Sequence, residues 1–178
     1  MKRFTPRVGF AVAVGFSLAA CGYRPVHGEG PLERFSVVLT ASSIPDSVTS
    51  DEVVAGVRDE LARSGALAAG DAYPRCEVEV LRADEASEGV SATRNRDQVL
   101  VPEARATSVG IVARAWISRS KEGPRERDTG DVRAMEFVTA ASNARDATFL
   151  HADALRSAGR RVGRRIGVHI LGLPSTSD

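Results

Sequence analysis

The sequence is poor in three features that many functional classes require: cysteine, aromatic residues and long apolar runs. Among 178 residues there are two cysteines, one Trp and an aromatic content of 5%. So few aromatic side chains argue against a platform on which nucleic-acid bases or sugars stack. The apolar run near the N-terminus covers only residues 8–20, whereas a helix that spans a membrane needs about 20 apolar residues.

The sequence also lacks the usual signatures of catalysis and metal binding. Its three histidines, His27, His151 and His169, are scattered, without His-x-x-x-His or Glu-x-x-His spacing. There is no phosphate-binding loop, no Gly-x-Ser-x-Gly elbow and no zinc ligand set. The acidic pair Asp84 and Glu85 lies in a polar segment with no sign of burial. We therefore predict a protein that is not an enzyme and that needs no metal or other cofactor.

The N-terminal 20 residues have the three parts of a secretory signal: a basic start, a short apolar run and a small-residue cleavage site. The basic start contains Lys2, Arg3 and Arg7, and Leu-Ala-Ala-Cys occupies residues 18–21. This tetrad resembles the lipobox of bacterial lipoproteins, in which the cysteine is acylated and the preceding peptide bond is cut. We predict cleavage between Ala20 and Cys21 and acylation of Cys21, with palmitate among the expected acyl chains. Two or three such chains hold a protein stably on a membrane. An ordinary signal peptide is the alternative.

Removal of residues 1–20 would leave enough chain for one domain with its own core. The full chain has net charge +1, and loss of three basic residues makes it −2, which gives no reason to expect a nucleic-acid partner. If Cys21 is acylated, Cys76 has no partner for a disulfide.

We expect a Gly- and Pro-rich lipidated tether at 21–31, one domain at 32–173 and a polar tail at 174–178. In bacterial lipoproteins, an Asp directly after the acylated cysteine commonly keeps the protein in the inner membrane. This chain has Gly22 at that position, which favours a location in the outer membrane.

Hydrophobic periodicity predicts four strands and two helices. A capping box, Thr49 with Glu52, is expected to begin the first helix, and Gly65 to end it. The second helix is expected from about Asn143 to Gly172. The polar segment 83–102 is interpreted mostly as a long hairpin connection, with or without continuation of the strands into it. Strands are predicted at 35–40, 75–82, 105–118 and 131–140, with a turn at 121–130.

This order of elements predicts an α+β fold: a two-layer sandwich with two helices packed on one face of a four-stranded, mainly antiparallel sheet. Alternation along 75–82 places Cys76 on the core face, where a thiol acts as a small apolar group. Trp116 falls on the opposite face of its strand. It either contacts a partner or covers a neighbouring helix, and the second interpretation is favoured.

Arginines recur every four residues on the second helix, at Arg156, Arg160 and Arg164, with Arg161 and Arg165 beside them. Cations late in a helix interact favourably with the negative end of its dipole, which accounts for much of the pattern as an ordinary solvated face. Guanidinium groups also pair with phosphate through two parallel hydrogen bonds. The second interpretation is therefore a face that binds anions, and the sequence leaves both open.

The residues that follow the predicted cleavage site are Cys-Gly-Tyr-Arg-Pro-Val-His-Gly, at 21–28. Together with the order strand, capped helix, three strands and long helix, they resemble the LptE family of lipopolysaccharide-assembly lipoproteins, particularly alphaproteobacterial ones. The resemblance implies a non-enzymatic plug in the lumen of an LptD-type outer-membrane β-barrel, which helps the barrel fold and assists delivery of lipopolysaccharide to the outer leaflet. Neither the segment 83–104 nor the arginines of 156–165 match a signature of the family.

As a hypothesis, the arginines of 156–165 meet phosphates of lipopolysaccharide or acidic residues of the barrel lumen. The alternative function is a structural or small-ligand-carrier lipoprotein of the envelope, unrelated to lipopolysaccharide. A barrel partner that stays bound in mild detergent would favour the plug. A monomer with an apolar pocket between its helices and its sheet would favour the carrier.

Overall fold

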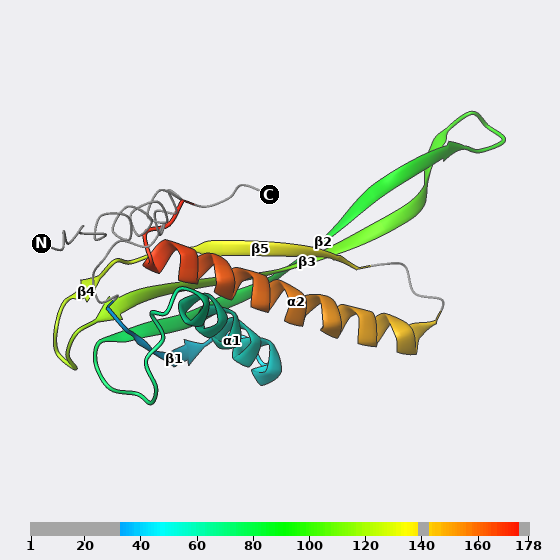
Figure 1. Cartoon of the computed structure of the whole chain (residues 1–178). Helices are drawn as coiled ribbons and strands as arrows, with labels where there is room; N and C mark the ends of the chain where they lie inside the picture. The colour runs from blue at the N-terminus through cyan, green and yellow to red at the C-terminus, as the bar shows by residue number, and fades with distance from the viewer. Residues whose placement is uncertain (1–32, 139–142, 175–178) are drawn as a thin grey trace, which may run out of the picture. The chain divides into compact units, whose positions relative to one another are not determined.

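Two helices lie on one face of a β-sheet in the computed structural model, which describes residues 33–138 and 143–174 (Figure 1). The predicted α+β class and the two-layer arrangement are confirmed. Within the described residues, no helix is both long and apolar enough to cross a membrane. The elements are β1 Ser36–Ser42, α1 Ser47–Arg63, β2 Arg75–Arg94, β3 Leu100–Ser118, β4 Arg125–Glu126, β5 Val132–Val138 and α2 Ala144–Ile170.

The four longer strands stand in the order β1-β2-β3-β5. β1 runs parallel to β2, whereas β2 and β5 are both antiparallel to β3. The sheet is therefore mainly antiparallel, as predicted. The two-residue β4 also pairs with β3, so the segment 121–130, expected to be only a turn, contributes a short strand.

The polar segment 83–104 extends two strands and leaves only a short turn between them. β2 has 20 residues and β3 has 19, and their register pairs Arg94 with Leu100. β1 accompanies β2 only as far as Val80, and β5 accompanies β3 only as far as Thr107. The remaining length, residues 88–106, is a two-stranded ribbon that continues away from the helices in Figure 1. We call these residues the distal ribbon.

The core lies between the helices and the sheet and consists of side chains that the apolar patterns predicted. Full burial of one Val, Leu or Ile contributes about 1.5–3 kcal/mol relative to exposure, so this layer is the main source of stability. Cys76 is fully buried on the core face, as predicted. Its neighbours in the core include Val53, Val57 and Leu61 of α1, Val78 and Val80 of β2, Ile111 and Ile117 of β3, and Val162, Ile166 and Ile170 of α2.

The two helices approach each other backbone to backbone because glycines line their contact. A Cβ atom on Gly163 of α2 would overlap the carbonyl oxygen of Val53 in α1. A Cβ atom on Gly56 of α1 would lie 3.0 Å from the backbone nitrogen of Arg164 in α2. Since the obstacles are backbone atoms, no side-chain rotation relieves the overlap. Even alanine would therefore force the helices apart at these positions.

Two further glycines, one turn on either side of Gly163, extend this contact along α2. A Cβ atom on Gly159 would lie 2.9 Å from the carbonyl oxygen of Thr49, and one on Gly167 would lie 2.6 Å from the Cβ of Glu60. The partners advance along α1 as the glycines advance along α2, so the two helices run parallel. The Gly-x-x-x-Gly-x-x-x-Gly spacing that builds this contact played no part in the prediction of the fold.

The predicted capping box of α1 is wrong, because the helix begins one turn earlier than expected. Asp46 is the N-cap: its carboxylate accepts hydrogen bonds from the backbone N–H of Val48 at 3.0 Å and from the hydroxyl of Thr49 at 2.6 Å. Thr49 is thus buried in the first turn, and Glu52 reaches across to α2. The carboxylate satisfies backbone donors that no intrahelical carbonyl can reach.

Both helices end at the predicted glycines. Gly65 has a φ of 70° and Gly172 a φ of 66°, a left-handed conformation that glycine adopts without a steric penalty. The guanidinium of Arg127 also donates to the carbonyl of Ile170, at 3.2 Å. A cation at this position suits the negative end of the helix dipole.

We predict that Gly163→Ala destabilises the fold, although alanine normally favours a helix by about 1 kcal/mol. Overpacking against a backbone atom costs about 1–3 kcal/mol or more, so we expect a net loss that urea unfolding would measure. Asp153→Ala, an exposed change in the same helix, should stay within about 0.5 kcal/mol of the wild type. An increase in stability for Gly163→Ala would contradict the close contact of the helices.

We predict that Asp46→Ala costs about 1 kcal/mol at neutral pH, the usual loss for an N-cap. The hydrogen bond from Thr49, with smaller contributions from backbone N–H groups and Arg156, lowers the pKa of Asp46 below its ordinary value of 3.8. The ionised carboxylate of Asp46 therefore contributes its full stabilisation of the fold above pH 3.8, its ordinary pKa. That contribution is lost as the pH falls through the lower pKa that Asp46 has in the folded chain.

Unfolding in urea at neutral pH and at about pH 3 or below would test this dependence on the N-cap. The difference between wild type and Asp46→Ala should shrink on acidification. Asp51→Ala, a change at an exposed carboxylate of the same helix, should cost less than half as much. An equal loss for both variants would show that Asp46 acts only through its charge.

Candidate functional site

The strongest functional signal in the sequence lies outside the described residues. Ala20, Cys21 and the tether at 21–31 belong to the segment that the structure does not describe. Cleavage at Ala20 and acylation of Cys21 therefore stay predictions from the sequence. The structure does describe the other sequence-predicted residues, the arginines of α2, and it divides them into groups with different surroundings.

Arg160 faces α1 and is held by two carboxylates. Its guanidinium lies 2.9 Å from a carboxylate oxygen of Glu52 and 2.7 Å from one of Asp59. The hydrogen bonds to Glu52 and then to Asp59 are the main causes that raise the pKa of Arg160. Its charge is thus neutralised within the fold, across the contact between the two helices.

Arg156 and Arg164, one turn on either side of Arg160, are exposed to solvent. Among the described residues neither forms an ion pair, although the charge of Arg156 helps to lower the pKa of Asp46. Of the three predicted contact residues, these two present guanidinium groups that are open to an external anion.

Arg161 and Arg165 turn instead toward β5. Arg161 forms an ion pair with Glu136 at 2.6 Å and donates to the carbonyl oxygen of Met135. Arg165 donates to the carbonyl oxygen of Arg133 at 2.7 Å. Both therefore tie α2 to the sheet, which separates them from Arg156 and Arg164.

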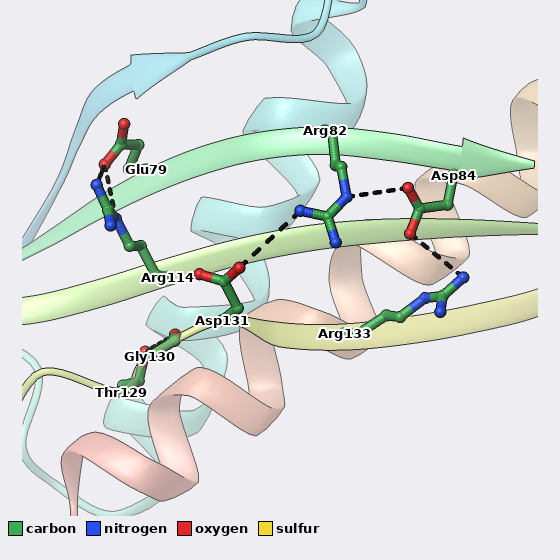
Figure 2. A network of polar contacts seen from close by, with 8 residues as sticks. All are labelled: Glu79, Arg82, Asp84, Arg114, Thr129, Gly130, Asp131 and Arg133. Carbon is green, nitrogen blue, oxygen red and sulfur yellow. Dashed lines mark hydrogen bonds and ion pairs between the residues drawn. The ribbon is translucent and has the colours of Figure 1, made fainter.

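The sheet face opposite the helices carries paired charges, shown in Figure 2 on the near side of the strands with the helices behind. Arg82 of β2 lies 3.1 Å from Asp84 and 3.9 Å from Asp131. The other oxygen of Asp84 lies 3.2 Å from Arg133 of β5. Arg82 and Arg133 both pair with Val112 in the strand register, and Val112 is only 1% exposed. The arginine stems thus flank an apolar side chain on the outer face.

The same pattern continues along the sheet around Trp116, which is only 2% exposed. Its indole N–H donates to Glu77 at 3.0 Å, and the guanidinium of Arg125 lies 3.8 Å from the centroid of its ring. Next to it, Arg114 forms an ion pair with Glu79 at 2.8 Å, and that hydrogen bond raises the pKa of Arg114. Trp116 therefore packs within the protein against side chains of neighbouring strands, and the predicted contact with a helix is wrong.

We call these side chains the outer-face network. It contains as many acidic as basic groups, so it presents polar atoms without a strong field of one sign. Such a surface suits contact with water or with a polar protein wall. Its members are Glu77, Glu79, Asp84 and Asp131 with Arg82, Arg114, Arg125 and Arg133.

Large apolar side chains are exposed mainly at the end of the molecule where the strands leave the helices. At the tip of the distal ribbon, Val99 is 56%, Leu100 62% and Val101 40% exposed. Phe137 near the end of β5 and Phe149 in the first turns of α2 are 69% and 66% exposed. No pattern in the sequence marks these residues as exposed, because exposure depends on where the sheet and the core end.

The one described thiol, that of Cys76, is shielded from solvent in the folded chain. Cys76 is fully buried, and burial, with a smaller contribution from the charge of Glu77, raises its pKa to about 12. His151 and His169 both lie on α2, as expected. Within the described residues, no three His, Cys, Asp or Glu side chains are arranged to hold a metal ion.

Comparisons with known proteins find the fold and no family. No family model matches the sequence, and no curated protein matches it. The crystal structure of a minor lipoprotein from Acinetobacter baumannii is similar, with a TM-score of 0.54 at 11% identity, over 83% of this chain and 98% of that chain. The similarity shows a shared fold.

Two further solved structures resemble the chain less closely. A candidate lipoprotein from Caulobacter crescentus CB15 has a TM-score of 0.46 at 14% identity, over 76% of this chain and 88% of that chain. Rare lipoprotein B from Shewanella oneidensis has a TM-score of 0.37 at 11% identity, over 74% and 89%. Neither of these two adds to the evidence for the fold.

We predict that Cys76 reacts with a disulfide reagent at least about a hundredfold more slowly in the folded chain than in the unfolded chain, because only the thiolate attacks. The rate is measured at pH 8 in a Cys21→Ser chain, where Cys76 is the single thiol, with and without guanidinium. A native rate within tenfold of the unfolded rate would contradict the buried position of Cys76.

Proposed function

We propose that this protein is a lipoprotein of the bacterial outer membrane, anchored through acylated Cys21. The Leu-Ala-Ala-Cys box at 18–21, placed after a basic start and a short apolar run, carries the proposal. The fold shared with a protein described as a minor lipoprotein is compatible with it. Three acyl chains on one residue would hold the folded body at the membrane surface.

We further propose that the body plugs an LptD-type β-barrel, helps it to assemble and assists delivery of lipopolysaccharide to the outer leaflet. The support is the resemblance of residues 21–28 to the start of LptE-type lipoproteins, together with the arrangement of two helices on a mainly antiparallel sheet. Large barrels have a polar lumen. The outer-face network offers a matching surface, with charges of both signs paired in place.

Within this proposal, Arg156 and Arg164 are the residues that contact phosphates of lipopolysaccharide or acidic groups of the barrel. Both are exposed, whereas Arg160 between them is occupied by Glu52 and Asp59. We therefore propose contact with an external anion for Arg156 and Arg164 alone, and not for Arg160. Arg160 joins the helices that carry them.

The packing of the body weighs against the alternative function of a small-ligand carrier. A carrier of this architecture would hold its ligand between the helices and the sheet. Buried side chains occupy that layer, among them Leu61, Val80, Ile111 and Ile166, all 0% exposed. Binding there would require the core to open. A purely structural envelope lipoprotein stays the competing proposal, and identification of bound partners separates the two.

We predict that the acylated wild-type chain, extracted from outer membranes in mild detergent, carries a β-barrel protein and lipopolysaccharide with it. Mass spectrometry of the processed N-terminus should find fatty acid on Cys21, and Cys21→Ser should abolish both the modification and the recovery. An N-terminus without fatty acid would contradict the proposed acyl anchor. Recovery of the acylated chain without a barrel or lipopolysaccharide would contradict the plug function and favour a purely structural lipoprotein.

The double variant Arg156→Glu, Arg164→Glu tests the contact residues. A hydrogen bond to a charged group contributes about 1.5–3 kcal/mol, so we expect bound lipopolysaccharide or barrel to fall at least about tenfold. The melting temperature should fall only slightly, because neither arginine forms an ion pair within the described residues and the charge of Arg156 contributes least to lowering the pKa of Asp46. Lys121→Glu, a reversal at an exposed turn residue, is the matched control. Unchanged recovery of both partners would exclude these arginines.

A further inference from the structure

The tip of the distal ribbon is apolar on both of its faces. Three consecutive side chains, Val99, Leu100 and Val101, are 56%, 62% and 40% exposed. The register pairs Leu100 with Arg94 and Val101 with Thr93, and the backbone N–H of Asn95 donates to the carbonyl of Val99. Because successive residues of a strand point to opposite faces, Leu100 and Val101 of β3 lie on opposite faces, and Val99 precedes them in the turn.

The turn at the tip is held in one conformation by its own hydrogen bonds. The side-chain oxygen of Asn95 accepts from the backbone N–H of Asp97 at 2.9 Å and of Val99 at 3.0 Å. The backbone N–H of Gln98 donates to the carbonyl of Asn95 at 3.0 Å. These bonds satisfy polar backbone atoms of the turn within the tip itself, which reduces the cost of moving it out of water.

The distal ribbon sets this tip away from the body. The last residue of β3 that pairs with β5 is Thr107, opposite Ser87 on β2. The strands continue from there to Arg94 and Leu100. At about 3.3 Å per residue, seven residues place the tip about 23 Å beyond the three-stranded part of the sheet. Figure 1 shows this ribbon leaving the helices behind.

The charges around the tip are those of a surface that approaches phosphate groups. Between residues 94 and 101 there are two arginines, Arg94 and Arg96, and one acidic residue, Asp97. Arg94 shares its face with Leu100, and its contact with Gln98 is long, at 3.4 Å. Arginine stems pack along apolar surface while the guanidinium stays with polar groups, the arrangement found at membrane interfaces.

A flat protein partner would cover one face of the ribbon and leave apolar side chains of the other in water. A bilayer surrounds an inserted tip and covers both faces at once. We propose that the tip inserts into the interface of a phospholipid bilayer, with Val99, Leu100 and Val101 below the headgroups and Arg94 and Arg96 at the phosphates. This contact goes beyond the proposed function, since it needs neither the acyl chains on Cys21 nor a barrel.

The test places an environment-sensitive fluorophore at the tip of the full-length chain through Leu100→Cys. Cys76 is 0% exposed in the core, so we expect it to compete little for the reagent. The matched control carries the same probe at Lys121→Cys, in the exposed turn before β4. Both chains are incorporated into vesicles of phosphatidylethanolamine and phosphatidylglycerol, and the state of Cys21 is read separately by mass spectrometry. If Cys21 proves unacylated, its free thiol would also react with the probe, so both chains then carry Cys21→Ser and excess vesicles replace the anchor.

We expect the probe at position 100 to shift its emission to the blue and to become several-fold less accessible to iodide in water when vesicles are present. The control probe should keep its aqueous spectrum. Adding Val99→Asp and Val101→Asp, both exposed positions, should abolish the shift without lowering the melting temperature. An aqueous spectrum at position 100 with saturating vesicles, acylated or not, would overturn the proposal. So would a shift that appears only with an added protein partner.

Discussion

The contact between α1 and α2 is the constraint on which the rest of the body depends. Gly56 on one helix and Gly159, Gly163 and Gly167 on the other allow the two backbones to touch. The two helices therefore occupy little more width than their backbones need, and both direct their apolar stripes onto the same sheet face. The close contact of the helices therefore keeps the core tightly packed. Tight packing matters because a gap of even one methyl group in a core lowers the stability of the fold.

Since both helices cover one face of the sheet, the other face has to be completed by the strands themselves. The outer-face network does so: arginine stems flank Val112, and the guanidinium of Arg125 lies over Trp116. Carboxylates pair with Arg82, Arg114 and Arg133. In the described part of the chain, buried side-chain polar atoms all have a hydrogen-bond partner. The result is a face of balanced acidic and basic groups, most of them in ion pairs, that water or a polar wall can meet.

Sequence periodicity predicted the elements that bury a face, because burial is what creates the period. It left open whether the strands continue into the polar segment 83–102, because that segment lacks the apolar alternation that burial against a core imposes. It also misplaced the start of α1, because Asp46 and Thr49 are both good N-caps and tertiary burial of Thr49 decides between them. The glycine spacing was present in the sequence, but the element against which it packs becomes known only with the fold.

The arginines of α2 show how the fold divides one sequence pattern into several roles. Spacing by four residues indicates a common face, but only α1 determines that Glu52 and Asp59 meet Arg160. A cation already paired with two carboxylates gains little from an external phosphate, since the new contact must displace an existing one. Exposed Arg156 and Arg164 have no such competitor among the described residues. The proposed contact with an anionic ligand therefore falls to these two arginines, and Arg160 holds together the surface that presents them.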